Sequence, residues 1–383
     1  MIAKIFPCLT PQADLNGELR GVRYFDIRKL TELECFRLMD VDEDDARKMC
    51  ESPLLSKSAR YKLAGNSIVV NCLYLIFKQI WNKQPDPSKQ PSLFGDLEPE
   101  WNVPIPDTIR MVTLCSGYDS QALAMRRFVD EMKANGTHAD FDLSAWAEYD
   151  PESKKPLDQQ PAVIAHNILF PQWKERNLGD MTKIDWQAWR KEHPEEIDLL
   201  TYSTPCQSIS QAGKREGIAK GSGTRSAVLW YTEEAIRTLR PKFLLQENVR
   251  ALCNKVNLPD FEAWQKVCKD CGYDNYWTVM NAKNYGIPQN RDRVFMLSVR
   301  KDLNLPEYEF PKPFPLESEV ADVLEQDADQ SYYLNPQNVI KFLQANDDEK
   351  GKGIIYLYTD HKFTDEELAE IRSNALRNEG AAD

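Results

Sequence analysis

The feature that most constrains the fold is a regular alternation of short apolar strands and amphipathic helices between residues 110 and 300. Helical patterns at 121–133, 227–238 and 258–271 separate the strand patterns. The six expected strands lie at 111–115, 141–146, 197–202, 243–247, 276–281 and 293–299. Such alternation predicts an α/β fold with a mixed, mostly parallel sheet and helices on both faces. Sheets of this kind bind ligands beyond the carboxyl ends of their strands, so chemistry is expected there.

The segments on either side of this alternation differ from it. Residues 27–82 are predicted to be helical, and Thr31 with Glu34 three positions later forms a capping-box pattern. Residues 83–110 contain six prolines and little periodicity, which indicates a surface linker. Residues 301–383 open with a proline-rich stretch and then become acidic and weakly structured.

Charge does not exclude a nucleic-acid partner, although the whole chain carries a formal net charge of −12. Residues 1–83 hold 13 Lys/Arg against 11 Asp/Glu, a net of +2, whereas residues 301–383 hold 8 against 19, a net of −11. Most of the acidity therefore belongs to the C-terminal segment, and DNA binding by the middle of the chain stays possible.

Three features favour a cytoplasmic protein with no membrane partner. The nine cysteines are unevenly spaced, as expected for reduced thiols rather than a disulfide framework. The apolar run 68–80 is too short to span a bilayer. The N-terminal sequence MIAKIFPCLTPQ has neither a secretory apolar core nor a cleavage site.

The strongest local signal for chemistry is Cys206. It directly follows Pro205 after the strand at 197–202 and precedes a glycine-rich polar segment. A cysteine at the carboxyl end of a strand, beside such a segment, is suited to a nucleophile that needs a closing lid. An isolated cysteine is a buried structural residue roughly nine times in ten, so the surrounding residues must decide.

Two further groups supply that context. Glu247 ends a hydrophobic strand and should reach the same rim of the sheet as Cys206. Gln289, Arg291 and Arg293 alternate at the start of the last strand, which places all three on one face. Each charged residue by itself is more often a solvated charge or a surface ion pair. Together they supply a thiol, a carboxylate and guanidinium groups that can converge on a small planar heterocycle.

These blocks resemble those of the DNA (cytosine-5)-methyltransferases in order and spacing. The matching segments are PCQ at 205–207, ENV at 247–249 and QNRDR at 289–293. GTRSAVL at 223–229 resembles the segment after the family's catalytic loop, and GDMT at 179–182 resembles its adenine-contacting turn. The resemblance implies the Rossmann-like fold of S-adenosylmethionine-dependent methyltransferases. It also implies S-adenosylmethionine as cofactor, double-stranded DNA as partner and a main catalytic domain over 111–300.

The resemblance further implies a mechanism. The Cys206 thiolate would add to carbon 6 of cytosine, because carbon 5 by itself is a poor nucleophile. Glu247 would hold N3 and the exocyclic amine, and Arg291 or Arg293 would bind O2 and pair with the carboxylate. Since a stacked base is inaccessible, the cytosine must be flipped into the pocket, with the loop 207–224 closing behind it. The residues expected to contact nucleic acid are Gln207, Ser208, Lys214, Arg215, Arg225 and Gln289.

Cofactor contacts are expected on the first half of the sheet. The segment CSGYDS at 115–120 takes the place of the family's glycine turn but departs from it, since Cys115 replaces an aromatic residue and Asp119 and Ser120 replace glycines. Glu148 suits the ribose hydroxyls, although an ordinary strand-end carboxylate is the alternative. The expected cofactor-binding residues are Gly117, Glu148, Tyr149, Asp180, Pro205, Val228, Asn66 and Ile68.

No metal site is expected. Cys268 and Cys271 form a single Cys-x-x-Cys pair with no second pair and no histidine cluster to complete it. Cys271 followed by Gly272 is instead typical of a helix end.

The family's last two blocks come first in this chain, which indicates a circular permutation. RKLTELECFRL at 28–38 and GNSIV at 65–69 resemble blocks that normally follow the target-recognition region. Residues 27–82 would then be the end of the catalytic domain, placed before its beginning. Within them, residues 61–81 are predicted to form a short turn followed by a buried helix.

The permutation would split the recognition region between residues 1–26 and 301–383. A surface that follows phosphates should carry basic charge, yet residues 301–383 are acidic. We therefore expect a reduced recognition region or a second polypeptide that supplies recognition.

Three hypotheses follow for function. The first is a DNA cytosine-5 methyltransferase of a bacterial or phage modification system. The second is an RNA cytosine-5 methyltransferase resembling the family's tRNA-acting branch, which also has a slight recognition region. The third is a non-catalytic nucleic-acid-binding homologue, as the altered glycine turn suggests. The intact Cys206, Glu247, Arg291 and Arg293 weigh against the third.

Overall fold

The structure is a computed structural model that describes residues 28–81, 101–205, 221 and 225–333, with the backbone of short strands nearer the termini. The chain divides into two compact units. The larger unit is Cys35–Val323, and the smaller one joins Met1–Glu34 with Leu324–Asp383. The boundary between the units falls within the short helix α1 (Glu32–Arg37).

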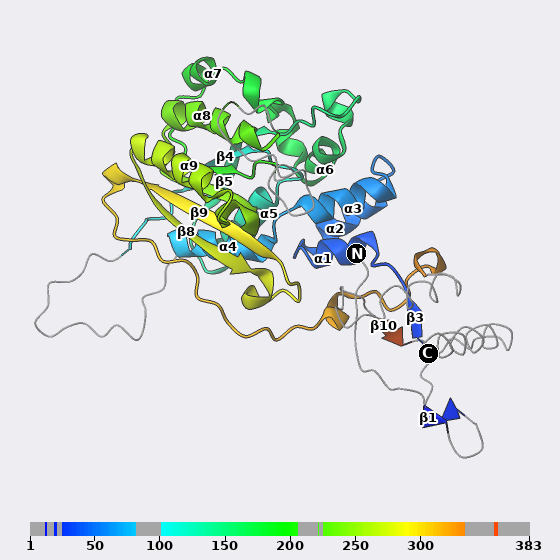
Figure 1. The fold of residues 1–383 in the computed structure, drawn as a ribbon. Helices are drawn as coiled ribbons and strands as arrows, with labels where there is room; N and C mark the ends of the chain where they lie inside the picture. The colour runs from blue at the N-terminus through cyan, green and yellow to red at the C-terminus, as the bar shows by residue number, and fades with distance from the viewer. Residues whose placement is uncertain are drawn as a thin grey trace, which may run out of the picture. The chain divides into compact units, whose positions relative to one another are not determined.

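A six-stranded sheet in the order β5-β4-β6-β7-β9-β8 forms the centre of the larger unit (Figure 1). The first four strands in this order are parallel, whereas β9 is antiparallel to both of its neighbours. Their bounds are β4 (Thr108–Leu114), β5 (Asp140–Ala147), β6 (Leu199–Tyr202), β7 (Phe243–Val249), β8 (Tyr273–Asn281) and β9 (Asp292–Arg300). All six predicted strands are present, and the predicted mixed, mostly parallel α/β sheet is confirmed.

Helices cover both faces of this sheet, as Figure 1 shows. The face that carries Leu244 packs against α7 (Trp186–Glu192), α8 (Thr232–Leu239) and α9 (Leu258–Asp270). The neighbouring Phe243 points to the opposite face, where its ring lies 5.9 Å from that of Trp81 on α4 (Val70–Trp81). The Trp81 ring also lies 6.0 Å from that of Phe128 on α5 (Ser120–Ala134). Alternate residues of β7 therefore pack into apolar layers on opposite faces of the sheet.

Two of the three predicted helices match closely, and the third is corrected at its start. The prediction for 121–133 corresponds to α5, and that for 258–271 to α9, which ends at the expected Cys271 cap. The predicted helix at 227–238 begins instead as the 3-10 helix η4 (Arg225–Tyr231) and becomes α8 only at Thr232. Such tighter turns are frequent at the start of α-helices.

Shorter helical segments fill the connections of the larger unit. They are α6 (Pro161–Leu169), η1 (Leu157–Gln159), η2 (Pro171–Arg176), η3 (Met181–Lys183), η5 (Arg250–Cys253), η6 (Ala282–Tyr285), η7 (Lys301–Leu303) and η8 (Val320–Val323). Most of them follow a strand's carboxyl end, where connecting segments build the rim of the sheet.

The N-terminal part of the larger unit is helical, as predicted, with one correction. The helices α2 (Glu43–Glu51) and α3 (Lys57–Asn66) precede α4. The sequence predicts that the stretch 61–81 opens with a short turn, but residues 61–66 are the second half of α3, because Ser56 caps that helix and its Leu63 and Ala64 are buried. The turn comes after Asn66 and leads into the predicted buried helix, α4.

The apolar helix α4 is a core helix. The stretch Lys57–Trp81 is long and apolar enough, by length and composition alone, to cross a membrane, yet 56% of its most apolar window is buried inside the protein. The buried residues of α4 include Leu73, Ile76, Phe77 and Ile80, which are fully covered by the rest of the unit. Packing inside the protein therefore accounts for the apolar sequence.

The segments predicted as linker and tail contribute to the larger unit. Trp101 is buried, and its indole Nε1 donates a hydrogen bond of 2.9 Å to the carbonyl of Ile80. Tyr308 lies 5.1 Å from the Trp101 ring, in an edge-to-face arrangement. Residues 101–110 and 301–323 thus pack with the sheet, while 83–100 lie outside the described residues.

The smaller unit joins segments from both ends of the sequence. The strand β3 (Phe25–Ile27) pairs antiparallel with β10 (Tyr356–Tyr358), and β1 (Gln12–Ala13) pairs with β2 (Leu19–Arg20). Its described side chains come from residues 28–34 and from 324–333, which include the 3-10 helix η9 (Gln330–Tyr332).

A buried ion pair ties these two segments together. Arg28 donates to both carboxylate oxygens of Glu34, at 2.8 and 2.6 Å, and Glu34 Oε1 also accepts from the backbone N–H of Glu325 at 2.7 Å. The predicted capping box is present as well, since the Thr31 backbone N–H donates to Glu34 Oε2 at 2.8 Å and the Glu34 N–H donates to Thr31 Oγ1 at 3.2 Å. Removing one partner of such a buried pair lowers the free energy of unfolding by about 3–5 kcal/mol.

Candidate active site

A cavity of about 940 Å³ lies at the carboxyl ends of the parallel strands. Its lining comes from the segments that follow β4, β5, β6 and β7, from the start of β9, and from the turn between α3 and α4. Glu247 and Arg293 line it. All eight residues expected to bind the cofactor line it too, namely Gly117, Glu148, Tyr149, Asp180, Pro205, Val228, Asn66 and Ile68.

The turn after β4 has left-handed backbone conformations that explain its unusual sequence. Gly117 has φ +60° and donates its backbone N–H to Glu148 Oε2 at 2.8 Å. Cys115 and Asp119 also have positive φ, at 52° and 69°. Aspartate tolerates this region better than most residues, because its short polar side chain bonds locally.

Asp119 does so here by capping α5. Its Oδ1 accepts from the backbone N–H of Ala122 at 3.0 Å, and its Oδ2 accepts from Thr113 Oγ1 at 2.7 Å. An aspartate at this position of a helix satisfies an N–H group that has no partner within the helix. The replacement of the family's glycine therefore preserves the turn.

A buried histidine faces the same aspartate. His166 Nε2 lies 3.7 Å from Asp119 Oδ2, both side chains are fully buried, and the His166 ring stacks 3.5 Å from that of Trp146. Burial raises the pKa of Asp119 to about 7, which outweighs its hydrogen bonds from Thr113 and Ala122. Burial also lowers the pKa of His166 to about 3. Both groups are therefore largely neutral at pH 6, and they form no charged pair there.

Asn177 supports the acidic side of the cavity and was missed by the sequence reasoning. Its Oδ1 accepts from the backbone N–H of Glu148 at 3.2 Å and from that of Gly179 at 2.9 Å. One side chain thus holds together the two segments expected to contact the cofactor. Its only sequence signal is its position two residues before the GDMT segment.

Two tyrosines expose their rings on the cavity lining. Tyr149 is 38% exposed, and the ammonium group of Lys183 lies 6.0 Å from its ring centroid. Tyr231 on η4 is 52% exposed and was not singled out from the sequence. Large aromatic rings left exposed in a cavity are suited to stacking on a planar ligand.

Glu247 and Arg293 are a charged pair in the cavity lining. Arg293 Nε lies 3.0 Å from Glu247 Oε1, and both side chains are largely buried. Burial raises the pKa of Glu247, while Arg293, Arg291 and a hydrogen bond from Ser203 act in the opposite direction. A carboxyl group in this setting can hold a proton and donate it to a ring nitrogen.

The segment that leads to Cys206 is held by side chains from other elements. Asn248 Nδ2 donates to the carbonyl of Thr204 at 3.2 Å, and Ser226 Oγ donates to that of Pro205 at 2.5 Å. Cys206 itself lies outside the described residues. So do the predicted nucleic-acid contacts Gln207, Ser208, Lys214 and Arg215, and the side chain of Arg225 at the start of η4.

The three residues of the QNRDR segment have separate partners. Gln289 Nε2 donates to the carbonyl of Leu38 at 3.4 Å, and Arg291 Nη2 donates to the carbonyls of Gly65 and Ser67 at 3.0 and 2.6 Å. Among the described residues, the cavity lining includes Arg293 but neither Gln289 nor Arg291. The alternation expected of a strand begins only at Asp292, where β9 starts, so it does not extend to these two residues.

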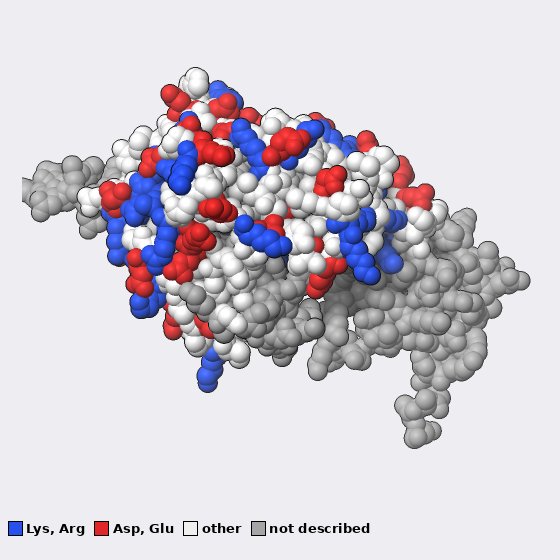
Figure 2. All heavy atoms as spheres, turned by 90° about the horizontal axis from the view of Figure 1, so that it is seen from above, with Lys and Arg blue, Asp and Glu red and all other residues white. Residues whose placement is uncertain are grey.

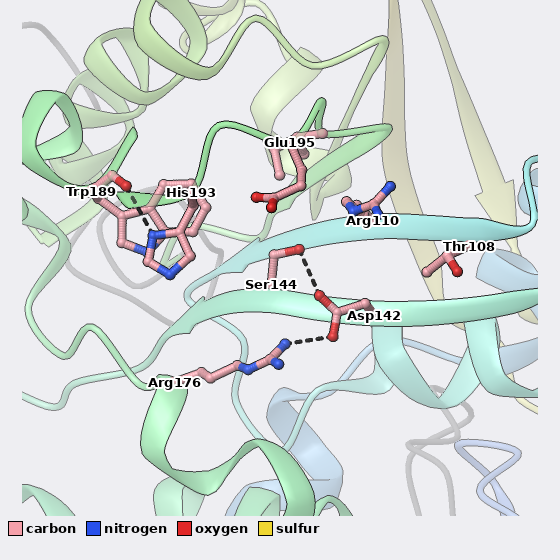
Figure 3. Close-up of a pocket in the computed structure, with 9 residues that line it drawn as sticks. Thr108, Arg110, Asp142, Ser144, Arg176, Trp189, His193 and Glu195 are labelled. Atoms are coloured by element: carbon pink, nitrogen blue, oxygen red, sulfur yellow. Dashed lines mark hydrogen bonds and ion pairs between the residues drawn. The ribbon is translucent and has the colours of Figure 1, made fainter. Parts of the chain in front are cut away.

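A second, smaller cavity of about 430 Å³ opens near the amino ends of the same strands (Figure 3). Two of its charged groups pair with each other, since Asp142 accepts from Arg176 Nη1 at 2.5 Å, and Asp142 also accepts from Ser144 Oγ at 2.9 Å. His193 stacks on Trp189, with 4.2 Å between the ring centroids. The larger cavity, at the end of the sheet where α/β proteins bind ligands, is therefore the candidate active site.

The face of the described residues that Figure 2 draws carries charges of both signs. On the face drawn in Figure 2, groups of Lys and Arg side chains alternate with groups of Asp and Glu over the described part of the chain. A mixed surface of this kind gives little long-range attraction for a polyanion.

Comparisons with known proteins place the chain among methyltransferases. The family profile described as "C-5 cytosine-specific DNA methylase" matches residues 109–380. The chain is 39% identical over 165 residues to the type II methyltransferase M2.ScrFI of Lactococcus lactis subsp. cremoris, covering 43% of this chain and 44% of the relative. It is 34% identical over 206 residues to the orphan methyltransferase M.SssI of Spiroplasma monobiae, and this match covers 52% of this chain and 50% of the relative.

The match to a further relative is longer but weaker. The chain is 27% identical over 280 residues to the type II methyltransferase M.HpaII of Haemophilus parainfluenzae, which covers 72% of this chain and 69% of the relative. The chain spans about half the length of the two relatives named before it.

Proposed function

The chain belongs to the C-5 cytosine-specific DNA methylase family, and on that premise we propose that it is a DNA cytosine-5 methyltransferase of a modification system, using S-adenosylmethionine. The observation that carries this proposal is the cavity of about 940 Å³ at the carboxyl ends of the parallel strands. Its lining holds the Glu247–Arg293 pair together with all the residues expected to bind the cofactor.

The donor set at one end of the cavity fits the cofactor. Glu148 and Asp180 offer carboxylates to the ribose hydroxyls and the adenine amine, and Tyr149 offers an exposed ring to the adenine face. Asn66 at the end of α3 and Ile68 in the turn that follows also line the cavity. S-adenosylmethionine, when bound, supplies the electrophilic methyl group that carbon 5 of the cytosine takes up.

The residues of the chain prepare the cytosine ring for this chemistry. The Cys206 thiolate donates an electron pair to carbon 6, forming the S–C6 bond and shifting the C5=C6 electrons toward carbon 5 and the ring. Glu247 promotes this addition by donating a proton or a hydrogen bond to N3, and Arg293 holds O2. When a base removes the carbon-5 proton, the electrons re-form C5=C6, the S–C6 bond breaks and the thiolate is released.

We further propose that the chain is a circularly permuted member of the family. The family's last two blocks precede the first strand in this sequence, and the second of them forms the α3–α4 turn, which lines the cavity. Contacts between residues far apart in sequence support this reading, because Arg291 bonds to Gly65, 226 positions earlier. A permuted chain needs such contacts to return its displaced block to the cofactor site.

The smaller unit is the proposed recognition region. It takes residues from both ends of the sequence, as a recognition region split by permutation would. Because the C-terminal segment 301–383 carries a net charge of −11, we propose that a second polypeptide contributes part of the DNA-binding surface.

The function can be tested by transfer of a radiolabelled methyl group from S-adenosylmethionine to duplex DNA and to tRNA in parallel. We expect labelled DNA, unlabelled tRNA and complete loss of transfer in Cys206→Ala. Labelled tRNA would favour the RNA-modifying hypothesis. No transfer to either substrate, together with no thermal shift on adding S-adenosylmethionine, would identify a non-catalytic homologue.

The need for a partner can be tested in cells. Bisulfite sequencing of DNA from cells that express this chain alone reports methylated positions and their sequence context. Methylation that appears only on co-expression of a second chain from the same modification system would support shared recognition. Full methylation at a defined sequence by this chain alone would rule it out.

A further inference from the structure

The last two residues of α3 and the start of the turn after it, residues 65–68 (called the α3–α4 turn below), reach the cavity from a part of the chain that is remote in sequence. Gly65, Asn66, Ser67 and Ile68 all line the cavity. The turn precedes the first strand of the sheet, and residues 82–100 between them lie outside the described part of the chain. Noncovalent contacts with residues remote in sequence hold the turn beside the sheet.

Arg291 makes the most specific of these contacts. Its Nη2 donates to the carbonyl of Gly65 at 3.0 Å and to that of Ser67 at 2.6 Å. The helix α3 ends at Asn66, so the Gly65 carbonyl is one of the last four that have no partner within the helix. A cation at this end also interacts favourably with the helix dipole. Arg291 thus caps the C-terminus of α3.

A second side chain holds the same turn from the other wall of the cavity. The hydroxyl of Tyr118 donates to Ser67 Oγ at 2.7 Å, and Tyr118 is buried at 2% exposure. Tyr118 belongs to the segment after β4 that also contains Gly117. The turn is therefore bonded both to the start of β9 and to the segment after β4.

Arg291 also stands beside the other functional part of the site. It is two residues from Arg293, which pairs with Glu247, and its positive charge acts on the Glu247 carboxyl. The segment 289–293 therefore places the Arg291 guanidinium against the α3–α4 turn and the Arg293 guanidinium against the Glu247 carboxylate.

We propose that Arg291 is a positioning residue that holds the α3–α4 turn in its cofactor-binding conformation. This inference rests on the proposed function, because it assumes that the cavity binds S-adenosylmethionine. It differs from a direct contact of Arg291 with the cytosine, which would leave cofactor affinity unchanged in the absence of DNA.

The test measures cofactor affinity without DNA by isothermal titration calorimetry with S-adenosylmethionine. In Arg291→Gln we expect the affinity to fall by roughly ten-fold to a hundred-fold, as for loss of hydrogen bonds from a charged donor. Arg291→Lys should recover part of it, since an ammonium group can still cap the helix but lacks the fork of the guanidinium. The matched control is Arg293→Gln, which should lose methyl transfer while keeping cofactor affinity within about two-fold of the wild type, as expected when no cofactor hydrogen bond is lost.

A surface control separates this effect from the loss of any arginine. Arg250 pairs with Asp292 in solvent, next to the same segment, so Arg250→Gln should change neither cofactor affinity nor methyl transfer. If Arg291→Gln fails to fold, Arg291→Lys and Tyr118→Phe carry the test, because each weakens the hold on the turn while keeping most of its packing.

The outcomes separate this inference from the proposed function. Equal cofactor affinity in the wild type and Arg291→Gln, at equal melting temperature, would overturn the positioning role and leave the proposed function intact. Reduced affinity with an unchanged melting temperature of the free protein, and partial rescue by lysine, would support it. A wild type that binds no S-adenosylmethionine would overturn both.

Discussion

Two regions of the cavity wall are built in different ways. The rim of the sheet carries Glu148 and Glu247 at the ends of strands whose register is fixed by backbone hydrogen bonds. The end of α3 and the turn after it carry Asn66 and Ile68, and they are held by side chains, chiefly Arg291 and Tyr118, and by the packing of α4. The rim should therefore tolerate loss of a single side chain without moving, whereas the turn should not.

The largest expected effect falls on the rim and should be purely chemical. In Glu247→Gln we expect the rate of methyl transfer to fall by about 10²- to 10⁴-fold, because the amide cannot deliver a proton to N3. Cofactor affinity and melting temperature should stay near the wild-type values, since the strand ladder holds position 247. Glu233→Gln is the control and should keep full activity, because Glu233 is half-buried on α8, pairs with Arg237 at 2.9 Å and does not line the cavity. Retention of more than about a tenth of the rate would contradict an acid-base role of this size.

The next prediction concerns the packing of α4, the helix that follows the turn. Phe77 on α4 is fully buried, so Phe77→Ala should reduce the free energy of unfolding by about 3–5 kcal/mol. Urea denaturation followed by tryptophan fluorescence measures this loss. Leu54→Ala removes a side chain that is 67% exposed and should change the same free energy by less than about 0.5 kcal/mol. A small effect at Phe77 would mean that α4 is not essential to the core of the larger unit.

A third prediction uses pH to test the buried pair of Asp119 and His166 beside the turn after β4. The pKa of Asp119 is raised to about 7, so its contribution to stability is lost as pH rises from about 4 to 7. The pKa of His166 is lowered to about 3, so its contribution is lost as pH falls from about 6.5 to 3. In the wild type the two slopes should largely cancel between about pH 4 and 6.5.

Single substitutions should reveal each slope. In Asp119→Asn the free energy of unfolding should rise with pH up to about 6.5, and in His166→Phe it should fall with pH up to about 7. Each change should amount to a few kcal/mol at most, because one pKa unit corresponds to about 1.36 kcal/mol. Denaturation series at several pH values measure it. Parallel curves for the two variants would show that these groups do not titrate as a buried pair.

The smallest expected effect concerns the hydrogen bond from Tyr118 to Ser67, the second contact that holds the turn. Tyr118→Phe removes the hydroxyl that donates to Ser67, so cofactor affinity should fall by about three- to ten-fold, as for one neutral hydrogen bond. Tyr74→Phe is a matched control, because the Tyr74 hydroxyl bonds to Glu131 at 2.5 Å on α5, and neither residue lines the cavity among the described residues. An equal loss in both variants would indicate a general effect of removing a hydroxyl rather than a hold on the turn.

The sequence by itself determined the strands and what stands at their ends. The two-residue period of a strand and the apolar runs of buried parallel strands are local properties, so all six strands could be predicted. The same holds for the capping box at Thr31 and Glu34, whose two hydrogen bonds span three residues. Because a strand carries its last residue to the rim, Glu148 and Glu247 could be placed from sequence as well.

Only the tertiary structure decided how distant segments meet. The partner of Arg291 lies more than two hundred residues earlier in the chain, and no periodicity relates the two. The support of Glu148 by Asn177 and the burial of His166 beside Asp119 are equally invisible in a local pattern. Side-chain contacts of this kind depend on which surfaces the folded chain brings together, whereas a strand and its end residue are connected covalently.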